Sequence, residues 1–530
     1  MTITPARIAA AACAGALIAL GLQGAAGQEQ PLAGAARTLV SDRGMPAIDR
    51  GLRSQDVVRD PGRVPRVPLP VDGADRTAVA GGYLPGTVIV KFKAGADRTA
   101  AVSSTMAQIS GTSAERPSFA DFEIVTIADG ADPADVAAEL RARSDVLYAQ
   151  PRYLNHTMYR PNDPLYANQW NFPALDMERA WDIQPGSASN VIVAVLDTGV
   201  AFKNATFRYR SSFAFRLTPG GPIYPPLGIV DVPFAIAPEL GDRFVSPRDF
   251  IWNDNLPLDM DGHGTHVSGT IGQLTNNNLG VVGVAGMAFN VRIMPVKVIA
   301  ETWDLIFDSP NDGTDDVVAR GVRYAADNGA QVINMSLGRE AGGPAPAVDD
   351  AIRYAVQHGA FVAIASGNTR EQGNQPNVIG NIAPSLAGAV TVGAVGRSLD
   401  VAFYSTTSSA VELSAPGGDF RQSGGAASGG ILQQTLDLDL LETFNRPPSQ
   451  FGPPRADSFA YYYFQGTSMA TPHVSGFAAL LVQQGITSPA AIEEAMKKWA
   501  TDKGATGRDD QYGVGLINPR ATLRGMGLAR

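Results

Sequence analysis

The chain has 530 residues, of which 45% are hydrophobic and 18% charged, and its formal net charge is -9. This is an ordinary globular composition, and the length allows a large core and more than one domain. The negative charge argues against a surface that binds phosphate groups, so we expect no nucleic-acid partner, whereas peptide substrates are compatible with it.

Residues 1–27 have the pattern of a secretory signal peptide. Arg7 supplies an early positive charge, an apolar segment extends from Ile8 to Leu20, and the small residues from Ala25 to Gly27 offer a cleavage site. The apolar segment is shorter than the roughly 20 residues that a helix needs to cross a bilayer. We therefore expect a secreted or periplasmic protein without a stable membrane anchor.

The only cysteine, Cys13, lies inside this apolar segment. It could be a lipoprotein cysteine, but it stands too early and in too weak a pattern, so we interpret it as part of the signal peptide. Cleavage near Gly27 would then leave a protein without thiols, whose stability must come from packing and metal ions.

Two different patterns follow the signal peptide. Residues 28–82 are rich in Arg, Pro, Gly and Ala without sustained periodicity, which indicates a linker. Residues 83–156 alternate strand and helix patterns, which predicts a small α+β domain. Its expected strands are Thr87–Phe92, Phe122–Ile127 and Val146–Pro151, and its expected helices are Arg98–Ile109 and Pro133–Arg143.

Residues 157–530 alternate apolar strands with helical segments, which is typical of an α/β fold with a mostly parallel sheet and helices on both faces. The expected strands are Val191–Leu196, Val291–Val298, Val332–Ser336, Phe361–Ala365 and Val390–Val395. Helices are expected after His263, over Asp315–Asn328 and Pro346–His358, and after Ser468. Ligands of such sheets gather at the carboxyl ends of the strands, where Asp197 would lie.

Two segments, near 202–237 and 417–463, interrupt this alternation. Their Gly, Pro and aromatic content suggests surface loops, which either extend a substrate cleft or decorate the fold. We slightly favour decoration.

Three motifs carry candidate chemistry. An apolar run ends in Asp197, His263 stands in the glycine-rich segment 261–269, and Ser468 follows Gly466 where a tight turn enters a helix. A serine hydroxyl is a poor nucleophile at neutral pH, so it needs a base within hydrogen-bond reach and a group that orients the base. Ser468, His263 and Asp197 supply this set, although only folding can bring them together.

This order of Asp, His and Ser, together with the three motifs, resembles the subtilisin-like serine peptidases, the subtilase family, over roughly residues 85–525. The resemblance implies a monomeric serine endopeptidase that acts on proteins or peptides. It also implies that residues 83–156 are an inhibitory propeptide, an intramolecular partner that is cut within residues 153–160. A permanent accessory domain is the alternative for this segment.

The resemblance further assigns Asn368, at the end of a buried strand, as the donor that stabilises the oxyanion, together with the backbone N–H of Ser468. The walls of the specificity pocket would be Ser336, Leu337 and Gly338 on one side and Ala365, Ser366 and Gly367 on the other. These small residues favour a roomy apolar pocket, and no acid stands where a basic-residue preference would need one. We expect broad cleavage after bulky apolar residues.

A structural calcium ion is the expected cofactor. The family's calcium loop matches residues 275–281, and oxygen ligands suit this ion. The expected ligands are Asp163, Glu239, Thr275, Asn277, Leu279 and Val281, with Glu239 in place of the family's usual Asp. The acids Asp254, Asp259 and Asp261 could hold a second ion, although a solvated acidic loop is the favoured interpretation.

The remaining motifs have simpler explanations. The glycine-rich run 280–286 could suggest a nucleotide loop, but no phosphate-binding lysine follows it. His266 and His473 are expected to pack or to form hydrogen bonds, and His156 and His358 have no supporting context. Two other functions remain open: a secreted binding or inhibitory protein locked by its propeptide, and an esterase or lipase. The second is disfavoured because the serine lacks the Gly-x-Ser-x-Gly context.

Overall fold

The computed structural model describes residues 39–40, 46–47, 83–128, 130–153, 160–185, 190–284 and 291–525. The expected signal peptide, His156 and most of the expected maturation segment lie outside these residues. Within 28–82, where we expected a linker, two short strands are described, β1 (Leu39–Val40) and β2 (Pro46–Ala47), which pair antiparallel. The chain divides into two units, one of residues 68–158 and one of the remainder, and each is described by itself.

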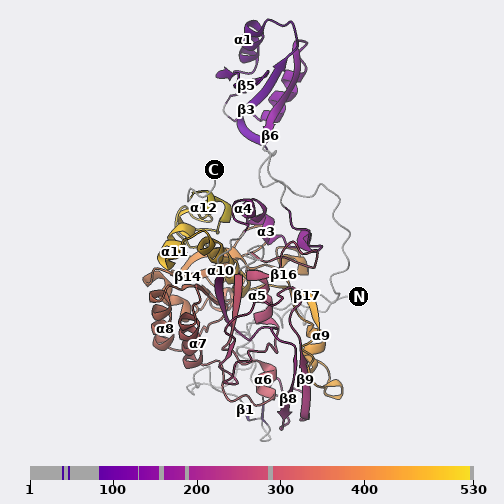
Figure 1. Cartoon of the computed structure of the whole chain (residues 1–530), viewed down its shortest axis with the longest axis vertical. Coiled ribbons are helices and arrows are strands. Elements are labelled where there is room, and N and C mark those ends of the chain that lie inside the picture. The colour runs from indigo at the N-terminus through magenta and orange to yellow at the C-terminus, as the bar shows by residue number, and fades with distance from the viewer. Residues whose placement is uncertain are drawn as a thin grey trace. The chain divides into compact units, whose positions relative to one another are not determined.

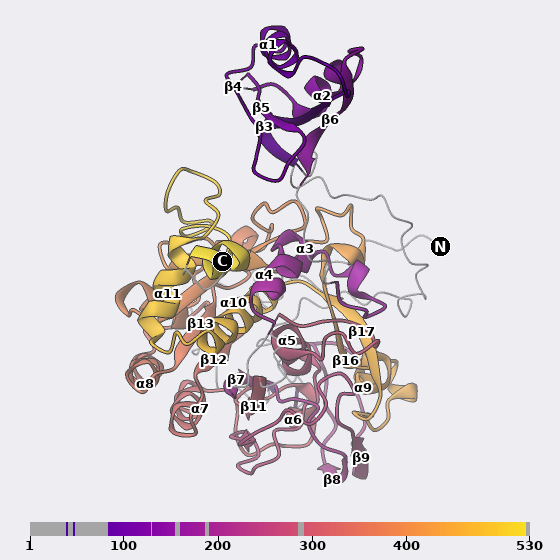
Figure 2. The ribbon, with the colours of Figure 1, turned by 45° about the horizontal axis from the view of Figure 1, so that its top comes forward.

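The smaller unit is the expected α+β domain (Figure 2). All five predicted elements are present, as β3 (Tyr83–Phe92), α1 (Arg98–Gln108), β5 (Glu123–Thr126), α2 (Pro133–Arg141) and β6 (Val146–Tyr153), and a short strand β4 (Ser113–Glu115) is added. The antiparallel sheet has the order β4-β5-β3-β6. Because side chains alternate along β3, Val88 and Val90 both point inward and pack with Leu140 of α2.

A parallel seven-stranded sheet forms the centre of the larger unit, with the order β10-β11-β7-β12-β13-β14-β15. All its neighbouring strands pair in parallel. The five predicted strands are β7 (Val191–Asp197), β11 (Val291–Lys297), β12 (Val332–Met335), β13 (Phe361–Ala365) and β14 (Ala389–Val395), while β10 (Arg248–Asp249) and β15 (Val411–Pro416) were not predicted. The expected α/β fold is therefore confirmed.

Helices cover both faces of this sheet (Figure 1). Val193 and Val195 of β7 belong to one core, which includes residues of α5 (His263–Gly272) and α10 (Thr467–Gln483). Ala194 and Leu196 belong to a second core, with residues of α7 (Asp315–Asp327) and α8 (Pro346–Gln357). Both faces of the strands are thus buried, which explains their continuous apolar sequence. Within the described ranges, no helix is long and apolar enough to cross a membrane.

The two interrupting segments fold as hairpins. The first contains β8 (Ala205–Ser211) paired with β9 (Gly228–Phe234), and the second contains β16 (Ile431–Leu436) paired with β17 (Phe459–Phe464). Every residue of β16 is buried, and the strand packs against α5. The prediction of a surface loop was wrong for this strand, because its period-two pattern is hidden by burial on both faces.

An aromatic cluster packs the second segment against residues that follow β11. Trp303 of α6 (Thr302–Ile306) is fully buried, and its ring centroid lies 5.2 Å from that of Phe307, 5.5 Å from that of Phe444 and 5.8 Å from that of Phe451. Its indole N–H donates to the carbonyl of Leu441, at 2.8 Å. Residues 438–451 are therefore held by a packed core rather than lying free on the surface.

Replacing Trp303 with alanine is expected to lower the free energy of unfolding by about 3–5 kcal/mol, because it leaves a large cavity and an unpaired carbonyl. Denaturant unfolding would measure this, in a Ser468→Ala background to prevent self-digestion. The control is Ile229→Ala, whose side chain is 60% exposed and whose loss should cost less than about 0.5 kcal/mol. Equal stabilities of the two variants would contradict the packed-core interpretation.

Candidate active site

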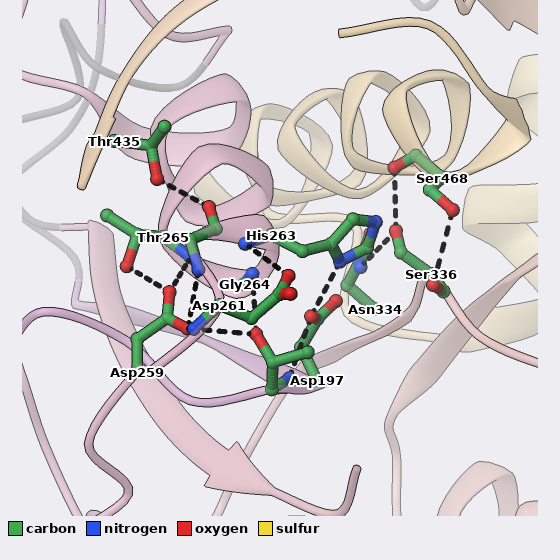
Figure 3. Close-up of polar contacts among 12 residues, drawn as sticks. Asp197, Asp259, Asp261, His263, Gly264, Thr265, Asn334, Ser336, Thr435 and Ser468 are labelled. Atoms are coloured by element: carbon green, nitrogen blue, oxygen red, sulfur yellow. Dashed lines mark hydrogen bonds and ion pairs between the residues drawn. The ribbon is translucent and has the colours of Figure 1, made fainter. Parts of the chain in front are cut away.

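The three residues singled out in the sequence stand at ends of elements that meet in the larger unit. Asp197 is the last residue of β7, His263 the first of α5 and Ser468 the second of α10. Figure 3 shows the imidazole of His263 between the carboxylate of Asp197 and Ser468. All three are buried, with exposed fractions of 1%, 3% and 4%.

Asp197 and His263 form a buried hydrogen-bonded pair. The imidazole Nδ1 lies 2.7 Å from Oδ1 of Asp197, and the same oxygen accepts from the backbone N–H of Thr198 at 2.8 Å. The approach of α5 to β7 requires glycine at position 264, because a Cβ there would lie 2.1 Å from the carbonyl oxygen of Gly199. The carboxylate thereby fixes both the orientation of the ring and the nitrogen that carries its proton.

The environment of His263 sets its proton affinity. Burial lowers the pKa, but the charge of Asp197 and its hydrogen bond outweigh burial, and Asp261 and Asp259 add to their effect, which raises the pKa to about 9. In the neutral ring, the proton is on Nδ1, which donates it in the hydrogen bond to Asp197. Its Nε2 accepts nothing within the described residues, so it is available as a base.

The hydroxyl of Ser468 forms no hydrogen bond with Nε2 of His263. Its hydroxyl donates to the carbonyl of Ser336 at 3.4 Å, which is a long hydrogen bond. Catalytic hydrogen bonds are often loose in the absence of substrate, and rotation about the Cα–Cβ bond of a serine moves its hydroxyl between acceptors. The arrangement therefore brings Ser468 to the same side of the ring as Nε2 without a formed bond.

Asn368 has a fixed orientation. Its Oδ1 accepts from both the backbone N–H and the hydroxyl of Thr467, at 2.9 and 3.0 Å. That hydroxyl also accepts from the N–H of Gly367, at 3.2 Å. With the oxygen side of the carboxamide held in this way, the NH2 side must point away from Thr467. Sequence reasoning missed Thr467, for which its position next to the serine was the only signal.

The expected pocket walls follow two neighbouring strands. Ser336, Leu337 and Gly338 come directly after β12, and Ala365, Ser366 and Gly367 stand at the end of β13. Asn377, which sequence reasoning also missed, joins the walls by donating to the carbonyls of Leu337 and Ala365, at 3.1 and 2.7 Å. A Cβ at Gly338 would lie 2.0 Å from the Asn377 amide nitrogen, so this wall tolerates no side chain there.

The acids before His263 form a structural turn. Asp259 accepts from the backbone N–H groups of Asp261, Gly262 and Thr265 and from the hydroxyls of Thr198 and Thr265. Asp259 and Asp261 are only 1% and 7% exposed, so the expectation of a solvated acidic loop was wrong for both. Four of these five bonds come from residues 261–265, so the carboxylate shapes that turn, and this function leaves Asp259 poorly placed for a second ion.

The expected calcium ligands lie around two buried carboxylates. Asp163 accepts from the N–H groups of Asn276 and Asn277, at 2.7 and 3.4 Å, and Glu239 accepts from that of Val281, at 3.0 Å. Burial raises the pKa of both carboxyls, and the charge of Asp163 raises that of Glu239 further. Two buried carboxylates that repel each other, with a loop wrapped around them, fit a divalent cation.

Other ligands of this site would have to come from the loop. The described ranges contain no group of three or more acidic, histidine or cysteine side chains that could hold a metal ion. The Oδ1 of Asn277 accepts from the N–H of Leu279 at 2.9 Å, and the hydroxyl of Thr275 donates to the carbonyl of Gln273 at 3.1 Å. Thr275, Leu279 and Val281 therefore could contribute only through backbone carbonyls.

The remaining described histidines are structural. Burial lowers the pKa of His266 to about 3 and that of His473 to about 4, so both rings are neutral. His266 stacks on Phe464, with ring centroids 4.1 Å apart, and its Nε2 lies 3.1 Å from the carbonyl oxygen of Ile431. The packing and hydrogen-bonding roles expected for these two residues are confirmed. His358 is exposed and stacks on Tyr354.

A parallel α/β sheet that brings an acid, an imidazole and a serine together at the ends of its elements defines the class of α/β serine hydrolases. The model of the Subtilase family matches residues 188–515, and the model of the Fervidolysin N-terminal prodomain matches residues 70–152. The chain therefore belongs to the subtilase family and is a serine protease with a propeptide.

Individual relatives agree with this assignment. The chain is 30% identical over 444 residues to the thermophilic serine proteinase of Bacillus sp. (strain AK1), covering 82% of this chain and 86% of the relative. It is 29% identical over 412 residues to an extracellular protease of Xanthomonas campestris, covering 74% and 62%. The solved structure of a lanthipeptide protease shares the fold, with a TM-score of 0.50, 21% identity and coverage of 70% of this chain and 100% of that one.

Proposed function

We propose that the protein is a secreted endopeptidase that matures by cutting off its own propeptide and then hydrolyses peptide bonds with Asp197, His263 and Ser468. The observation that carries the proposal is the buried bond between Nδ1 of His263 and Asp197, with the unpartnered Nε2 turned toward the side of Ser468. A ring held in this way can take a proton only at Nε2, which is where a serine base must take it.

In the proposed cycle, the Oγ of Ser468 attacks the carbonyl carbon of the peptide while His263 takes the hydroxyl proton. The protonated ring, stabilised by Asp197, then gives this proton to the leaving amine, and an acyl-enzyme remains. Water repeats both steps and releases the carboxylate product. The NH2 group of Asn368 and the N–H of Ser468 would donate to the oxyanion, because the first N–H groups of α10 have no partner within the helix.

The substrate would lie extended between the two pocket walls. Main-chain bonds to exposed strand ends give affinity without regard to sequence, whereas the side chain before the cut enters the space between the walls. Small residues line both walls and carry no charge, which favours broad cleavage after bulky apolar residues. We assign Ser336, Leu337 and Gly338 to one wall and Ala365, Ser366 and Gly367 to the other.

Export and self-inhibition complete the proposal. We assign residues 1–27 to a signal peptide, 28–82 to a linker, 83–156 to the inhibitory propeptide and 157–530 to the peptidase domain. The match of residues 70–152 to a prodomain model and the similarity to an extracellular protease support this division. The alternative, a binding protein locked by its propeptide, predicts that the chain stays whole.

Active-site labelling tests the proposal directly. The purified protein would be incubated with and without phenylmethylsulfonyl fluoride, followed by intact mass, casein hydrolysis and mapping of the labelled peptide. We expect loss of the N-terminal region, casein hydrolysis that the reagent stops, and a single label on Ser468. A whole and unlabelled chain without activity would favour the locked binding protein, and a label on another serine would overturn the assignment.

The raised pKa of His263 predicts an alkaline enzyme. The ring must be neutral to accept the proton of Ser468, so kcat/KM should rise with pH until it levels off at about pH 9. Below this pKa, each pH unit should lower kcat/KM by about tenfold, because only the neutral fraction is active. Steady-state rates on a neutral peptide between about pH 5 and about pH 11 would give the profile. An acid limb centred at about pH 6.5 would show that Asp197 does not raise the pKa of His263.

Calcium is proposed as a structural ion held by Asp163, Glu239, Asn277 and the carbonyls of Thr275, Leu279 and Val281. When bound, it would neutralise the two buried carboxylates and fix the loop. In a Ser468→Ala background, EDTA is expected to lower the thermal midpoint, and calcium at about 1,000 times its Kd would add about 4 kcal/mol of stability.

The Asp163→Asn variant should lose this response, because it removes one of the two charges that face the ion. Asp231→Asn is the matched control, since this exposed acid only pairs with Arg208 on the β8–β9 hairpin. Equal thermal midpoints with calcium and with EDTA in the parent would contradict the calcium site.

A further inference from the structure

The first turn of α10 contains a carbonyl that the helix cannot satisfy. In an α-helix, the carbonyl of residue i accepts from the N–H of residue i+4. Four residues after Ser468 stands Pro472, which has no N–H. The carbonyl of Ser468, which belongs to the same residue as the proposed nucleophile, therefore lacks its helical donor.

A side chain from the sheet replaces this donor. The hydroxyl of Ser336 donates to the Ser468 carbonyl at 2.8 Å (Figure 3). The Ser336 hydroxyl in turn accepts from Nδ2 of Asn334 at 2.9 Å, and Oδ1 of Asn334 accepts from the hydroxyl of Ser475 at 2.9 Å. Each donor and acceptor along this path is used, and the bonds all run in one direction, from Ser475 to Ser468.

This chain of hydrogen bonds from Ser475 through Asn334 and Ser336 to Ser468, which we call the relay, is closed to water. Asn334 and Ser475 are fully buried, and Ser336 is 1% exposed. Hydrogen bonds in such an environment polarise one another, and a buried polar group that loses its partner cannot find water instead. Ser475 lies about two turns after Ser468 on the same helix, so Asn334 of β12 and the following Ser336 bind both ends of this stretch of α10. The position of Ser468 thus depends on a bond made seven residues further along.

We propose that Ser475, acting through Asn334 and Ser336, is a positioning residue for Ser468. The proposal rests on the assignment of Ser468 as the nucleophile. Without the hydroxyl of Ser475, the carboxamide of Asn334 loses the bond that distinguishes its oxygen from its nitrogen, and Ser336 loses a defined donor. The turn that carries Ser468 is then held less firmly, and small displacements of a reacting atom lower the rate of attack.

The test compares Ser475→Ala with the wild type in two assays: inactivation by phenylmethylsulfonyl fluoride, and kcat and KM on a chromogenic peptide. The small reagent reports on the hydroxyl of Ser468 without the main-chain contacts that an extended peptide substrate makes. We expect inactivation and kcat to fall by about three- to tenfold, the loss typical of one buried hydrogen bond, with KM unchanged. Ser475→Thr, which keeps a hydroxyl, should recover most of the rate.

Ser268→Ala is the matched control, because Ser268 is an equally buried serine, in α5, whose hydroxyl has no partner among the described residues. A wild-type inactivation rate in Ser475→Ala would overturn the proposal, as would an equal loss in the control. If Ser475→Ala does not fold, Ser336→Ala cuts the last bond of the relay outside the helix. The Ser336→Ala variant should be inactivated about three- to tenfold more slowly than the wild type, the loss expected for Ser475→Ala. A wild-type inactivation rate in Ser336→Ala would overturn the proposal.

Failure of the relay and failure of the nucleophile assignment give different results. If Ser468 is not the nucleophile, Ser468→Ala keeps its peptidase activity. If only the relay is wrong, Ser468→Ala is inactive while Ser475→Ala reacts like the wild type.

Discussion

Replacing Ser468 with alanine is expected to abolish self-processing and to lower kcat on peptides by about 10⁶-fold, the loss that removal of the nucleophile causes in subtilisin. The reason is that His263 then has no hydroxyl to deprotonate, although the pocket walls and oxyanion donors remain. A residual rate of about 10³- to 10⁴-fold over water should persist, because these groups still bind the peptide and polarise its carbonyl. Single-turnover peptide hydrolysis and intact mass would measure both effects.

The control for this variant is again Ser268→Ala, which removes a buried hydroxyl without touching the proposed chemistry. It should process itself and keep kcat near that of the wild type. Peptidase activity in Ser468→Ala that phenylmethylsulfonyl fluoride still blocks would point to another serine and would remove the present assignment.

Replacing Asp197 with asparagine is expected to lower kcat by about 10⁴-fold while the fold is kept. An amide at this position can donate to Nδ1 of His263, which moves the ring proton to Nε2, where the base must be free. The charge of Asp197 is also the largest influence that raises the pKa of His263 against burial. Without it, the acid limb of kcat/KM should move to lower pH.

The same pair links stability to pH. Because the folded state raises the pKa of His263 to about 9, protonated His263 paired with Asp197 contributes stability that is fully present below its unfolded pKa of about 6.5. This contribution is lost as pH rises through about 9. Thermal unfolding of the Ser468→Ala parent across this window should show the loss, and the added Asp197→Asn change should remove it.

Asp231→Asn serves as the control for both measurements. This acid is exposed on β9 and paired with Arg208 across solvent-exposed strands, so its loss should change neither kcat nor the pH profile, and it should leave the stability nearly unchanged. An Asp197→Asn enzyme with an unshifted acid limb would show that another group sets the pKa of His263.

The sequence predicted the central elements well because their patterns are local. The apolar run ending in Asp197 became β7, and α5 and α10 begin at His263 and next to Ser468, as the flanking glycines indicated. Burial on both faces gives parallel strands a continuous apolar sequence, which stands out without any knowledge of the neighbours. The order of the three motifs likewise needed no structure to be noticed.

Other elements escaped prediction because their partners lie far away. The strand β16 reads Ile-Leu-Gln-Gln-Thr-Leu, with polar residues that look exposed. In the structure, the amide of Gln433 donates to the carbonyl of Val282, 151 residues away. The amide of Gln434 donates to the carboxylate of Glu239, 195 residues away. A buried polar side chain can be recognised only once its distant partner is known.

The sequence by itself determined the class of protein, the fold of its peptidase domain and the residues that we propose for the chemistry, because motif identity and strand patterning are written in consecutive residues. Only the tertiary structure decided how these residues are oriented. Asn368 is turned by Thr467, 99 residues away, and Ser468 is held by Ser336, 132 residues away. Hydrogen-bond geometry depends on atoms brought together by long-range packing, and no local pattern records which donor will meet which acceptor.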